Sequence, residues 1–397
     1  MKIAFLTSGG IAPCLSAAIA RLTENYFNNY PDAEIIGYIN GYKGLLLGKS
    51  IPFPKKLINN IQNLYEFGGS PIGNSRVKLT NIQDCIAQGY IKEKEVPLEV
   101  AAKQLMKDKI DILHTIGGDD TNTTAADLSN YLKENNYNLT VVGLPKTIDN
   151  DVFPIKQTLG AWTAAEQGAI FFENIINENT TSERQLIIHE VMGRHCGWLT
   201  AATASEYRKR LKNLKFIPEI GVTTKKWDIH SILIPEENVD LEKESSRLNK
   251  IMEKYDCVNI FLSEGAGLET IINETEKEGG TILRDAFGHV RLDDLNPGQW
   301  FAKQFKTRLQ AKKVLVQKSG YFGRSSKANQ KDLELIFEMA DYAVKSATNG
   351  FNGVVGLDED NNNLRCIEFH RIKGGKPFNI NQDWYIKMMK EIKEIEE

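Results

Sequence analysis

The 397-residue sequence has few cysteines and no long apolar run. Its five cysteines are scattered and odd in number, without a CxxC pair, which argues against a disulfide framework or a zinc site and indicates a reducing compartment. No window of about 18 apolar residues exists, and Ser8, Gly9 and Gly10 interrupt the first apolar run before a signal-peptide core could form. We therefore expect a cytoplasmic protein that is neither exported nor inserted in a membrane.

A strong net charge is also absent. The 49 Lys and Arg residues against 52 Asp and Glu residues leave a formal net charge of −3, so no general attraction to nucleic acid or to an anionic membrane is expected. Solenoid repeats, low-complexity tracts and Gly/Ser linkers are missing as well. With 41% hydrophobic residues the chain can bury a sizeable core. We expect a globular protein whose anionic ligands are held by local sites.

Short apolar runs alternate with helix-like segments along the chain. The runs end in glycine or polar clusters: KIAFLTSGG, AEIIGYINGY, IDILHTIGGDD, TVVGLPKTIDND, QLIIHEVMGR, SILIPEE, CVNIFLSEGAG, KVLVQKSGY and GVVGLDED. Helices are expected at 16–28, 98–107, 123–134, 159–178, 241–254, 298–310 and 329–348. This pattern predicts an α/β fold with two doubly wound, mainly parallel sheets. In such sheets ligands bind at the carboxyl ends of the strands, where the clusters lie.

The first cluster, TSGGIAPCLS, lies between an expected strand and an expected helix. Its glycines would turn backbone N–H groups toward a phosphate at the start of the helix. It is not a Walker A motif, because no Gly-Lys-Ser/Thr follows. A tight strand-to-helix turn without a ligand explains the same residues equally well.

The cluster GGDDTNTT places two carboxylates side by side after a strand. Asp119 suits Mg²⁺, which takes one or two carboxylates together with water and substrate phosphates. Asp120 is harder to explain as a second ligand, because adjacent side chains in a loop usually diverge. An alternative is that Asp120 caps the helix that begins near Thr123.

The segment LPKTIDNDVFP supplies a cation, a hydroxyl and two carboxylates in Lys146, Thr147, Asp149 and Asp151. In an extended segment, residues two apart point to the same side. These are the groups that phosphoryl transfer needs: a cation for phosphate, a hydrogen-bond donor, a proton acceptor and a carboxylate near a metal. A surface turn rich in Asp and Asn is the alternative.

Three later strand ends carry groups that suit a phosphorylated sugar. Arg194 is followed by small residues, so a phosphate could reach its guanidinium group. Glu264 precedes glycines and could accept hydrogen bonds from sugar hydroxyls. The loop QKSGYFGRSS adds further cationic and hydroxyl groups, whereas Met192 and His189 are typical of core positions. One set of groups thus fits Mg²⁺ and a transferable phosphate, and another fits a phosphorylated polyol, which indicates a phosphotransferase.

Eight motifs resemble, in their order and spacing, those of the 6-phosphofructokinase family: TSGG, GYKGLLLG, GGSPIGNSR, GGDD, PKTIDND, MGRHCGW, SEGAG and GYFGRS. The resemblance covers nearly the whole chain and extends to the pyrophosphate-dependent branch. It implies two Rossmann-like domains. Residues 1–160 with about 323–375 would bind the phosphoryl donor and Mg²⁺, and residues 161–322 with about 376–397 would bind the sugar phosphate.

The resemblance also implies which donor is used. ATP-dependent members typically have Gly after the metal-site Asp, which leaves room for the α-phosphate, whereas pyrophosphate-dependent members typically have Asp, as this chain has at 120. The size and charge of Asp120 would oppose ATP, and each 1.4 kcal/mol or so changes the preference about tenfold. Lys146 is similar to the Lys of pyrophosphate-dependent members, where ATP-dependent members usually have a small residue. It would bind the exposed phosphate of pyrophosphate.

Residue by residue, the resemblance implies that Asp149 takes the proton from the 1-hydroxyl of fructose 6-phosphate, whose oxygen attacks the terminal phosphorus of pyrophosphate in line. Asp119 would hold Mg²⁺, Asp151 would assist nearby, and Thr147 would hydrogen-bond the transferring group. The other residues implied are Gly10, Arg76 and Lys146 on the donor side, and Met192, Gly193, Arg194, Glu264, Tyr321 and Arg324 on the sugar-phosphate side. The implied reaction is reversible and belongs to glycolysis or gluconeogenesis.

Three positions depart from the family pattern. Tyr321 stands where the family commonly has His, and Leu315 stands where it commonly has Arg, so Lys313 or Lys318 would supply that charge. Arg184 is the nearest counterpart, displaced by about one residue, of the Arg that reaches a neighbouring subunit's phosphate. Because relatives share sites between subunits, a homodimer or homotetramer is expected.

Two alternatives remain at the level of sequence. An ATP-dependent 6-phosphofructokinase would require that Asp120 only caps a helix. A non-catalytic paralogue that binds sugar phosphate would be favoured by loss of Asp149 or Asp119, and both residues are present.

Overall fold

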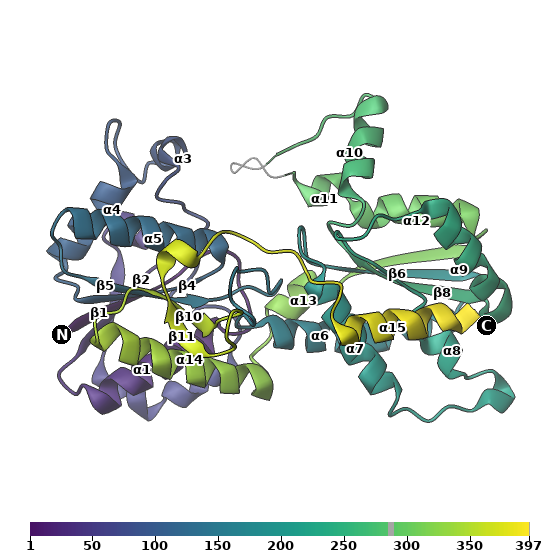
Figure 1. Cartoon of the computed structure of the whole chain (residues 1–397), viewed down its shortest axis with the longest axis horizontal. Coiled ribbons are helices and arrows are strands. Elements are labelled where there is room, and N and C mark those ends of the chain that lie inside the picture. The colour runs from purple at the N-terminus through teal and green to yellow at the C-terminus, as the bar shows by residue number, and fades with distance from the viewer. Residues whose placement is uncertain (285–289, 397) are drawn as a thin grey trace. The chain divides into compact units, whose positions relative to one another are not determined.

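The computed structural model describes residues 1–284 and 290–396 (Figure 1). The chain forms two compact units. The first unit contains residues 1–163 and 324–376, and the second contains residues 164–323 and 377–397. Helices α6 (Ala161–Ile175) and α13 (Gly320–Arg324) each run across a boundary between these segments.

The first unit has a seven-stranded sheet with the order β11-β10-β5-β4-β1-β2-β3. The strands are β1 (Lys2–Thr7), β2 (Glu34–Tyr38), β3 (Ser50–Phe53), β4 (Ile112–Gly117), β5 (Thr140–Pro145), β10 (Gly353–Leu357) and β11 (Leu364–Ile367). The five central strands are parallel, and the edge strands β3 and β11 pair antiparallel. Strand β4 is buried along its whole length, as expected for a parallel strand covered on both faces.

Helices cover both faces of this sheet. Figure 1 shows α1 and α14 on one face and α4 and α5 on the other. The helices of this unit are α1 (Leu15–Asn29), α2 (Tyr42–Leu46), α3 (Ile82–Ala87), α4 (Pro97–Lys107), α5 (Asp119–Glu134) and α14 (Gln330–Thr348), with 3₁₀ turns η1 (Lys55–Asn59), η2 (Ile61–Glu66) and η5 (Phe369–Arg371).

The second unit has a four-stranded parallel sheet with the order β7-β8-β6-β9. Its strands are β6 (Gln185–Val191), β7 (Ser231–Leu233), β8 (Cys257–Ser263) and β9 (Lys313–Lys318). Besides α6 and α13, its helices are α7 (Trp198–Leu211), α8 (Thr224–Trp227), α9 (Leu241–Tyr255), α10 (Leu268–Lys277), α11 (Leu292–Leu295), α12 (Pro297–Arg308) and α15 (Asp383–Lys393), with 3₁₀ turns η3 (Ile176–Thr180), η4 (Pro218–Ile220) and η6 (Glu394–Glu396).

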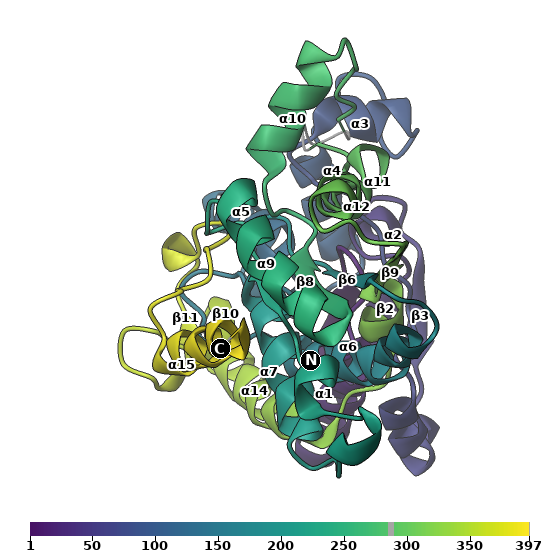
Figure 2. The same ribbon diagram turned by 90° about the vertical axis from the view of Figure 1, so that its right-hand side faces the viewer.

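Two apolar clusters hold this second sheet. One joins α6, α7 and α15 to one face, and the other joins α9, α10 and α12 to the opposite face. Figure 2 shows α9 beside β8. The buried His189 stacks on Phe172 of the first cluster, and its ring forms a hydrogen bond with Ser319 Oγ at 2.7 Å. Burial lowers the pKa of His189 to about 3, so the ring is neutral and has the structural role expected from the sequence.

The α/β fold with mainly parallel sheets is confirmed, and each of the nine predicted apolar runs contains a strand. The antiparallel edge strands β3 and β11 were not predicted. Helix α5 begins at Asp119 rather than near Thr123, because Gly118 is its N-cap residue and the two carboxylates fall in the first turn.

Among the described helices, none combines the length and apolar character needed to cross a bilayer.

Candidate functional site

The turn after β1 faces two cationic side chains in the first unit. Gly9 has a φ of +83°, a conformation that favours glycine, and a Cβ atom there would lie 3.2 Å from Nζ of Lys146. A Cβ atom at Gly10 would lie 3.9 Å from Nη2 of Arg76. Glycine thus keeps the backbone open between a lysine and an arginine. This arrangement suits a phosphate, which backbone N–H groups and cations bind together.

Lys146 follows β5 and is only 4% exposed. Its backbone N–H donates to Gly117 O at 2.8 Å, and its Nζ donates to Gly10 O. Burial lowers the pKa of Lys146 to about 8, and the positive charge of Arg76 acts in the same direction. Burying an unpaired charge costs free energy, and an anionic ligand that pairs with the ammonium group of Lys146 offsets this cost.

Asp151 and Asp119 lie close enough to interact electrostatically. The pKa of Asp151 is raised to about 6, mainly by burial and next by the negative charge of Asp119, while a hydrogen bond from Thr147 opposes the shift. No cluster of three or more His, Cys, Asp or Glu ligands exists in the described part of the chain. Two mutually repelling carboxylates fit Mg²⁺, because this ion needs few protein oxygens and completes its shell with water and phosphate.

The loop that carries Asp149 is held by internal hydrogen bonds. The Asp149 N–H donates to Thr147 Oγ1 at 3.1 Å, and Thr158 Oγ1 donates to Thr147 O at 2.8 Å. Asn150, which has a φ of +56°, accepts from the Thr158 N–H at 2.8 Å through Oδ1. These bonds set the direction of the backbone at 147–151, so the Asp149 carboxylate projects from an ordered loop.

The second unit joins the loops after β6 and β8. Gly193 has a φ of +134°, and a Cβ atom there would lie 2.5 Å from Cys196 O. Ser263 Oγ donates to Gly193 O at 2.5 Å, and the Gly193 N–H donates to Glu264 Oε1 at 3.3 Å. Burial raises the pKa of Glu264, because the charged carboxylate is poorly solvated there. The hydroxyl groups of a polar ligand would supply hydrogen bonds that water does not. A Cβ atom at Gly265 would overlap Arg194 O at 1.8 Å, which shows how closely the loops pack.

The loop after β9 continues this second set. Met192 packs against Gly320, where a Cβ atom would lie 2.7 Å from Met192 Cε. Tyr321 is 65% exposed in α13. Lys318 pairs with the buried Glu190 at 2.9 Å, at the end of β9 that lies beside the end of β6. Glu190 also accepts from the Gly298 N–H at 2.9 Å, a role that sequence reasoning missed.

One predicted residue, Arg184, lies apart from this set. Arg184 precedes β6, at the opposite end of that strand from Met192, and donates to Leu309 O at 2.6 Å and Gln310 O at 3.0 Å. Its contact with a partner subunit stays a prediction. Arg324 is the last residue of α13 and the first of the segment that belongs to the first unit.

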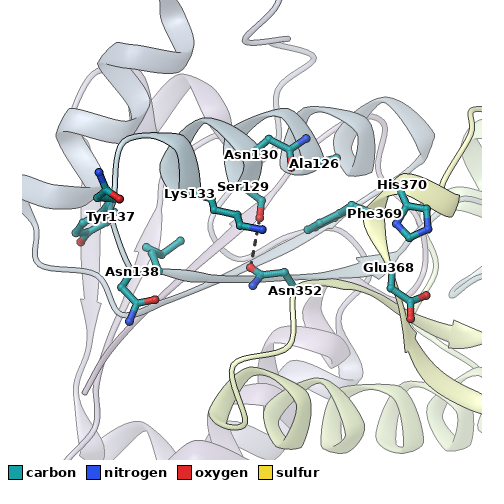
Figure 3. Close-up of a pocket in the computed structure, with 12 residues that line it drawn as sticks. Ala126, Ser129, Asn130, Lys133, Tyr137, Asn138, Asn352, Glu368, Phe369 and His370 are labelled. Carbon is teal, nitrogen blue, oxygen red and sulfur yellow. Dashed lines mark hydrogen bonds between the residues drawn. The ribbon is translucent and has the colours of Figure 1, made fainter.

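A separate cavity of about 670 Å³ lies at the amino end of β5 in the first unit (Figure 3). Ser129, Asn130 and Lys133 line it from one face of α5, and Asn352 and Phe369 line it from other segments. Lys133 lies in the last turn of α5, where its charge complements the helix dipole. None of the site residues predicted from the sequence lines this cavity.

The comparisons with known proteins agree with this geometry. The sequence pattern of the family described as Phosphofructokinase matches residues 2–347. The chain belongs to the phosphofructokinase family. It is 58% identical over 392 residues to a pyrophosphate–fructose 6-phosphate 1-phosphotransferase of Methylomonas methanica, with 98% of this chain and 96% of that protein covered. A protein of the same name from Propionibacterium freudenreichii is 53% identical over 392 residues, with 98% and 97% covered.

A solved structure has a fold similar to that of this chain. The crystal structure of a pyrophosphate-dependent phosphofructokinase from Marinobacter aquaeolei superposes with a TM-score of 0.74 at 20% identity, covering 98% of this chain and 91% of that one. Phosphofructokinases are phosphotransferases that normally use a divalent metal ion, and the neighbouring carboxylates of Asp119 and Asp151 carry oxygen atoms of the kind that such ions prefer.

In this phosphofructokinase, Lys78 is a second residue that sequence reasoning missed. Its Nζ lies 2.7 Å from Asp120 Oδ1, and the Asp120 side chain is 53% exposed. The N-cap residue of α5 is Gly118, and Asp120 lies in the first turn of the helix. The carboxylate is therefore directed to a cation rather than to the helix backbone, and its charge is partly neutralised. The only sequence signal was the position of Lys78 two residues after Arg76.

Proposed function

We propose that this chain catalyses the reversible, Mg²⁺-dependent transfer of a phosphoryl group from pyrophosphate to the 1-hydroxyl of fructose 6-phosphate, which gives fructose 1,6-bisphosphate and phosphate. The observation that carries the proposal is the position of two side chains, Lys146 and Asp120. Lys146 Nζ reaches Gly10 O, and Asp120 occupies the first turn of α5 beside the metal-type carboxylate Asp119. The names of the relatives above support the same donor and acceptor.

On the donor side, the N–H groups at Gly10, the Lys146 ammonium and the Arg76 guanidinium bind the phosphates of pyrophosphate. Asp119, with Asp151 nearby, would hold Mg²⁺, which would neutralise charge on the phosphoryl oxygens when bound. The Thr147 hydroxyl bonds the transferring group. Two cations and one metal ion match a donor whose whole negative charge lies on the oxygen atoms of two linked phosphoryl groups.

In the transfer step, the Asp149 carboxylate accepts the proton of the 1-hydroxyl. The sugar oxygen forms a bond to the terminal phosphorus while the bridging P–O bond breaks, and phosphate leaves. The hydrogen bonds within the 147–151 loop hold the backbone that carries this carboxylate, which reduces the rearrangement needed to bring the base to the substrate.

On the acceptor side, Arg194 and Arg324 bind the 6-phosphate, and Glu264 accepts hydrogen bonds from sugar hydroxyls. Met192, Gly193 and Tyr321 form the surface against the sugar. Lys318 replaces the Arg that the family has at Leu315, because it lies at the carboxyl end of β9, whereas Lys313 lies at the amino end of that strand. Arg184 serves a partner subunit in a homo-oligomer.

One observation favours ATP as the donor. The Lys78–Asp120 pair lowers the negative charge that a nucleotide would meet. The side chains of the pair still occupy space that a glycine would leave open, so pyrophosphate remains the better candidate.

The deciding experiment measures fructose 1,6-bisphosphate formation with Mg²⁺ and either pyrophosphate or ATP, together with the reverse reaction driven by phosphate. Rapid turnover with pyrophosphate and little with ATP supports the proposal. Equal or faster turnover with ATP overturns the choice of donor.

The KM for pyrophosphate is expected to rise as the pH increases through about 8. Burial lowers the pKa of Lys146 to about that value, so the ammonium that attracts the donor loses its proton above it. The measurement is the KM for pyrophosphate from about pH 7 to 9, compared with a Lys146→Arg variant, which stays charged throughout. The ratio of the two profiles cancels the titration of pyrophosphate itself. Parallel profiles would show that Lys146 does not titrate in this range.

A Lys78→Met variant is expected to raise the KM for pyrophosphate about two- to fivefold, the range for a partly exposed ion pair. Without its partner, Asp120 repels the donor more strongly. The effect should shrink in an Asp120→Asn background if Lys78 acts through that carboxylate. Lys103→Met, which breaks the surface pair with Glu99, is the matched control. An equal effect in both backgrounds would mean that Lys78 acts independently of Asp120.

A further inference from the structure

Asn74 connects the GGSPIGNSR loop to the Gly9-Gly10 turn. Its amide Nδ2 lies 3.3 Å from Gly9 O and 3.3 Å from Gly10 O. The residues on either side of it are tied to the end of β1. Thr7 Oγ1 donates to Gly73 O at 2.8 Å, and the Gly9 N–H donates to Ser75 O at 2.9 Å. Asn74 is therefore held in place from both sides.

The bonds to the two carbonyl groups set the direction of the N–H groups that follow. A trans peptide unit is planar, so its C=O and N–H groups point in opposite directions. When Asn74 binds Gly9 O and Gly10 O, the N–H groups of Gly10 and Ile11 point away from Asn74. Within the described residues, these two N–H groups have no hydrogen-bond partner. They are the donors that an anion at this turn would bind.

Lys146 shares one of these acceptors. Its Nζ also donates to Gly10 O. An ammonium that turns toward pyrophosphate weakens or gives up this bond, so Asn74 becomes the main side chain that holds the turn.

We propose that Asn74 is a positioning residue for the phosphoryl donor, which fixes the two peptide units so that the Gly10 and Ile11 N–H groups face pyrophosphate. This inference rests on the function proposed above. Asn74 does not touch the reacting atoms in this scheme; it acts through the backbone of the turn.

The test compares Asn74→Ala and the isosteric Asn74→Asp with the wild-type enzyme. Both variants lose the amide donor, and we expect the KM for pyrophosphate and for phosphate in the reverse reaction to rise about tenfold or more. The KM for fructose 6-phosphate should change less than about twofold. Asn135→Ala and Asn135→Asp are matched controls, because Asn135 Nδ2 also donates to a backbone carbonyl, Tyr131 O at 2.8 Å, at the far end of α5. The controls should leave all KM values unchanged.

Three outcomes overturn the inference. The KM for pyrophosphate is unchanged in both Asn74 variants, or it rises together with the KM for fructose 6-phosphate and a lower melting temperature, as general destabilisation would cause. The third is a wild-type enzyme that does not turn over pyrophosphate at all, which removes the proposed function as well. If Asn74→Ala fails to fold, Asn74→Asp decides the question because it keeps the side-chain volume.

Discussion

Replacing Asp149 with Asn is expected to lower kcat about 10²- to 10⁴-fold, the contribution typical of a general base. Asparagine keeps the size of the side chain but cannot take the proton from the 1-hydroxyl of the sugar. The Asp149 N–H donates to Thr147 Oγ1 through the backbone, so the loop should keep its conformation. The measurement is the initial rate at saturating pyrophosphate and fructose 6-phosphate in both directions, with the KM for the sugar phosphate expected to change little.

Asp111→Asn is the control for this substitution. Asp111 precedes β4, at the opposite end of that strand from Asp119. Its exposed carboxylate accepts a hydrogen bond from the Lys2 N–H at 2.7 Å. Asparagine can still accept that bond, so turnover should remain at the wild-type level. A normal kcat in Asp149→Asn would remove Asp149 as the base. A large rise in the KM for fructose 6-phosphate without a loss of kcat would instead make it a binding residue.

The double substitution of Asp120 and Lys146 by Gly is expected to shift the donor preference from pyrophosphate toward ATP. Asp120→Gly removes the carboxylate from the first turn of α5 and leaves the Lys78 ammonium available to a nucleotide phosphate. Lys146→Gly removes the buried cation beside Gly10. If each change is worth about 1.4 kcal/mol, the ratio of kcat/KM for ATP over pyrophosphate rises about 100-fold in the double variant.

The kinetics of the single and double variants with both donors check this prediction. Thr123→Gly is the control, because it places glycine at an exposed position in the same end of α5 without removing a charge. Its donor ratio should equal that of the wild type. An unchanged ratio in the double variant would mean that the two side chains do not select the donor. The KM for fructose 6-phosphate reports whether the acceptor side stays intact.

Much of the fold was predictable because parallel strands are buried on both faces. Such strands appear in sequence as short continuous apolar runs, and the glycines and carboxylates after them mark the ends where ligands bind. This is why the clusters at Gly10, Asp119 and Lys146 could be predicted to form one site before the strand order was known. The edge strands β3 and β11 were missed because they are short and partly exposed, so their residues carry little of that pattern.

The sequence by itself determined the alternation of strands and helices, the chemical character of the loops and the family. Tertiary structure decided which loops meet. Lys78 finds Asp120, and Asn74 finds Gly9 and Gly10, only because the sheet order places β1 between β4 and β2 and brings the 68–78 loop to the ends of β1 and β4. Arg184 shows the converse, because strand β6 separates it from Met192. Local patterns depend on neighbours in the chain, whereas these contacts depend on how non-adjacent strands pair.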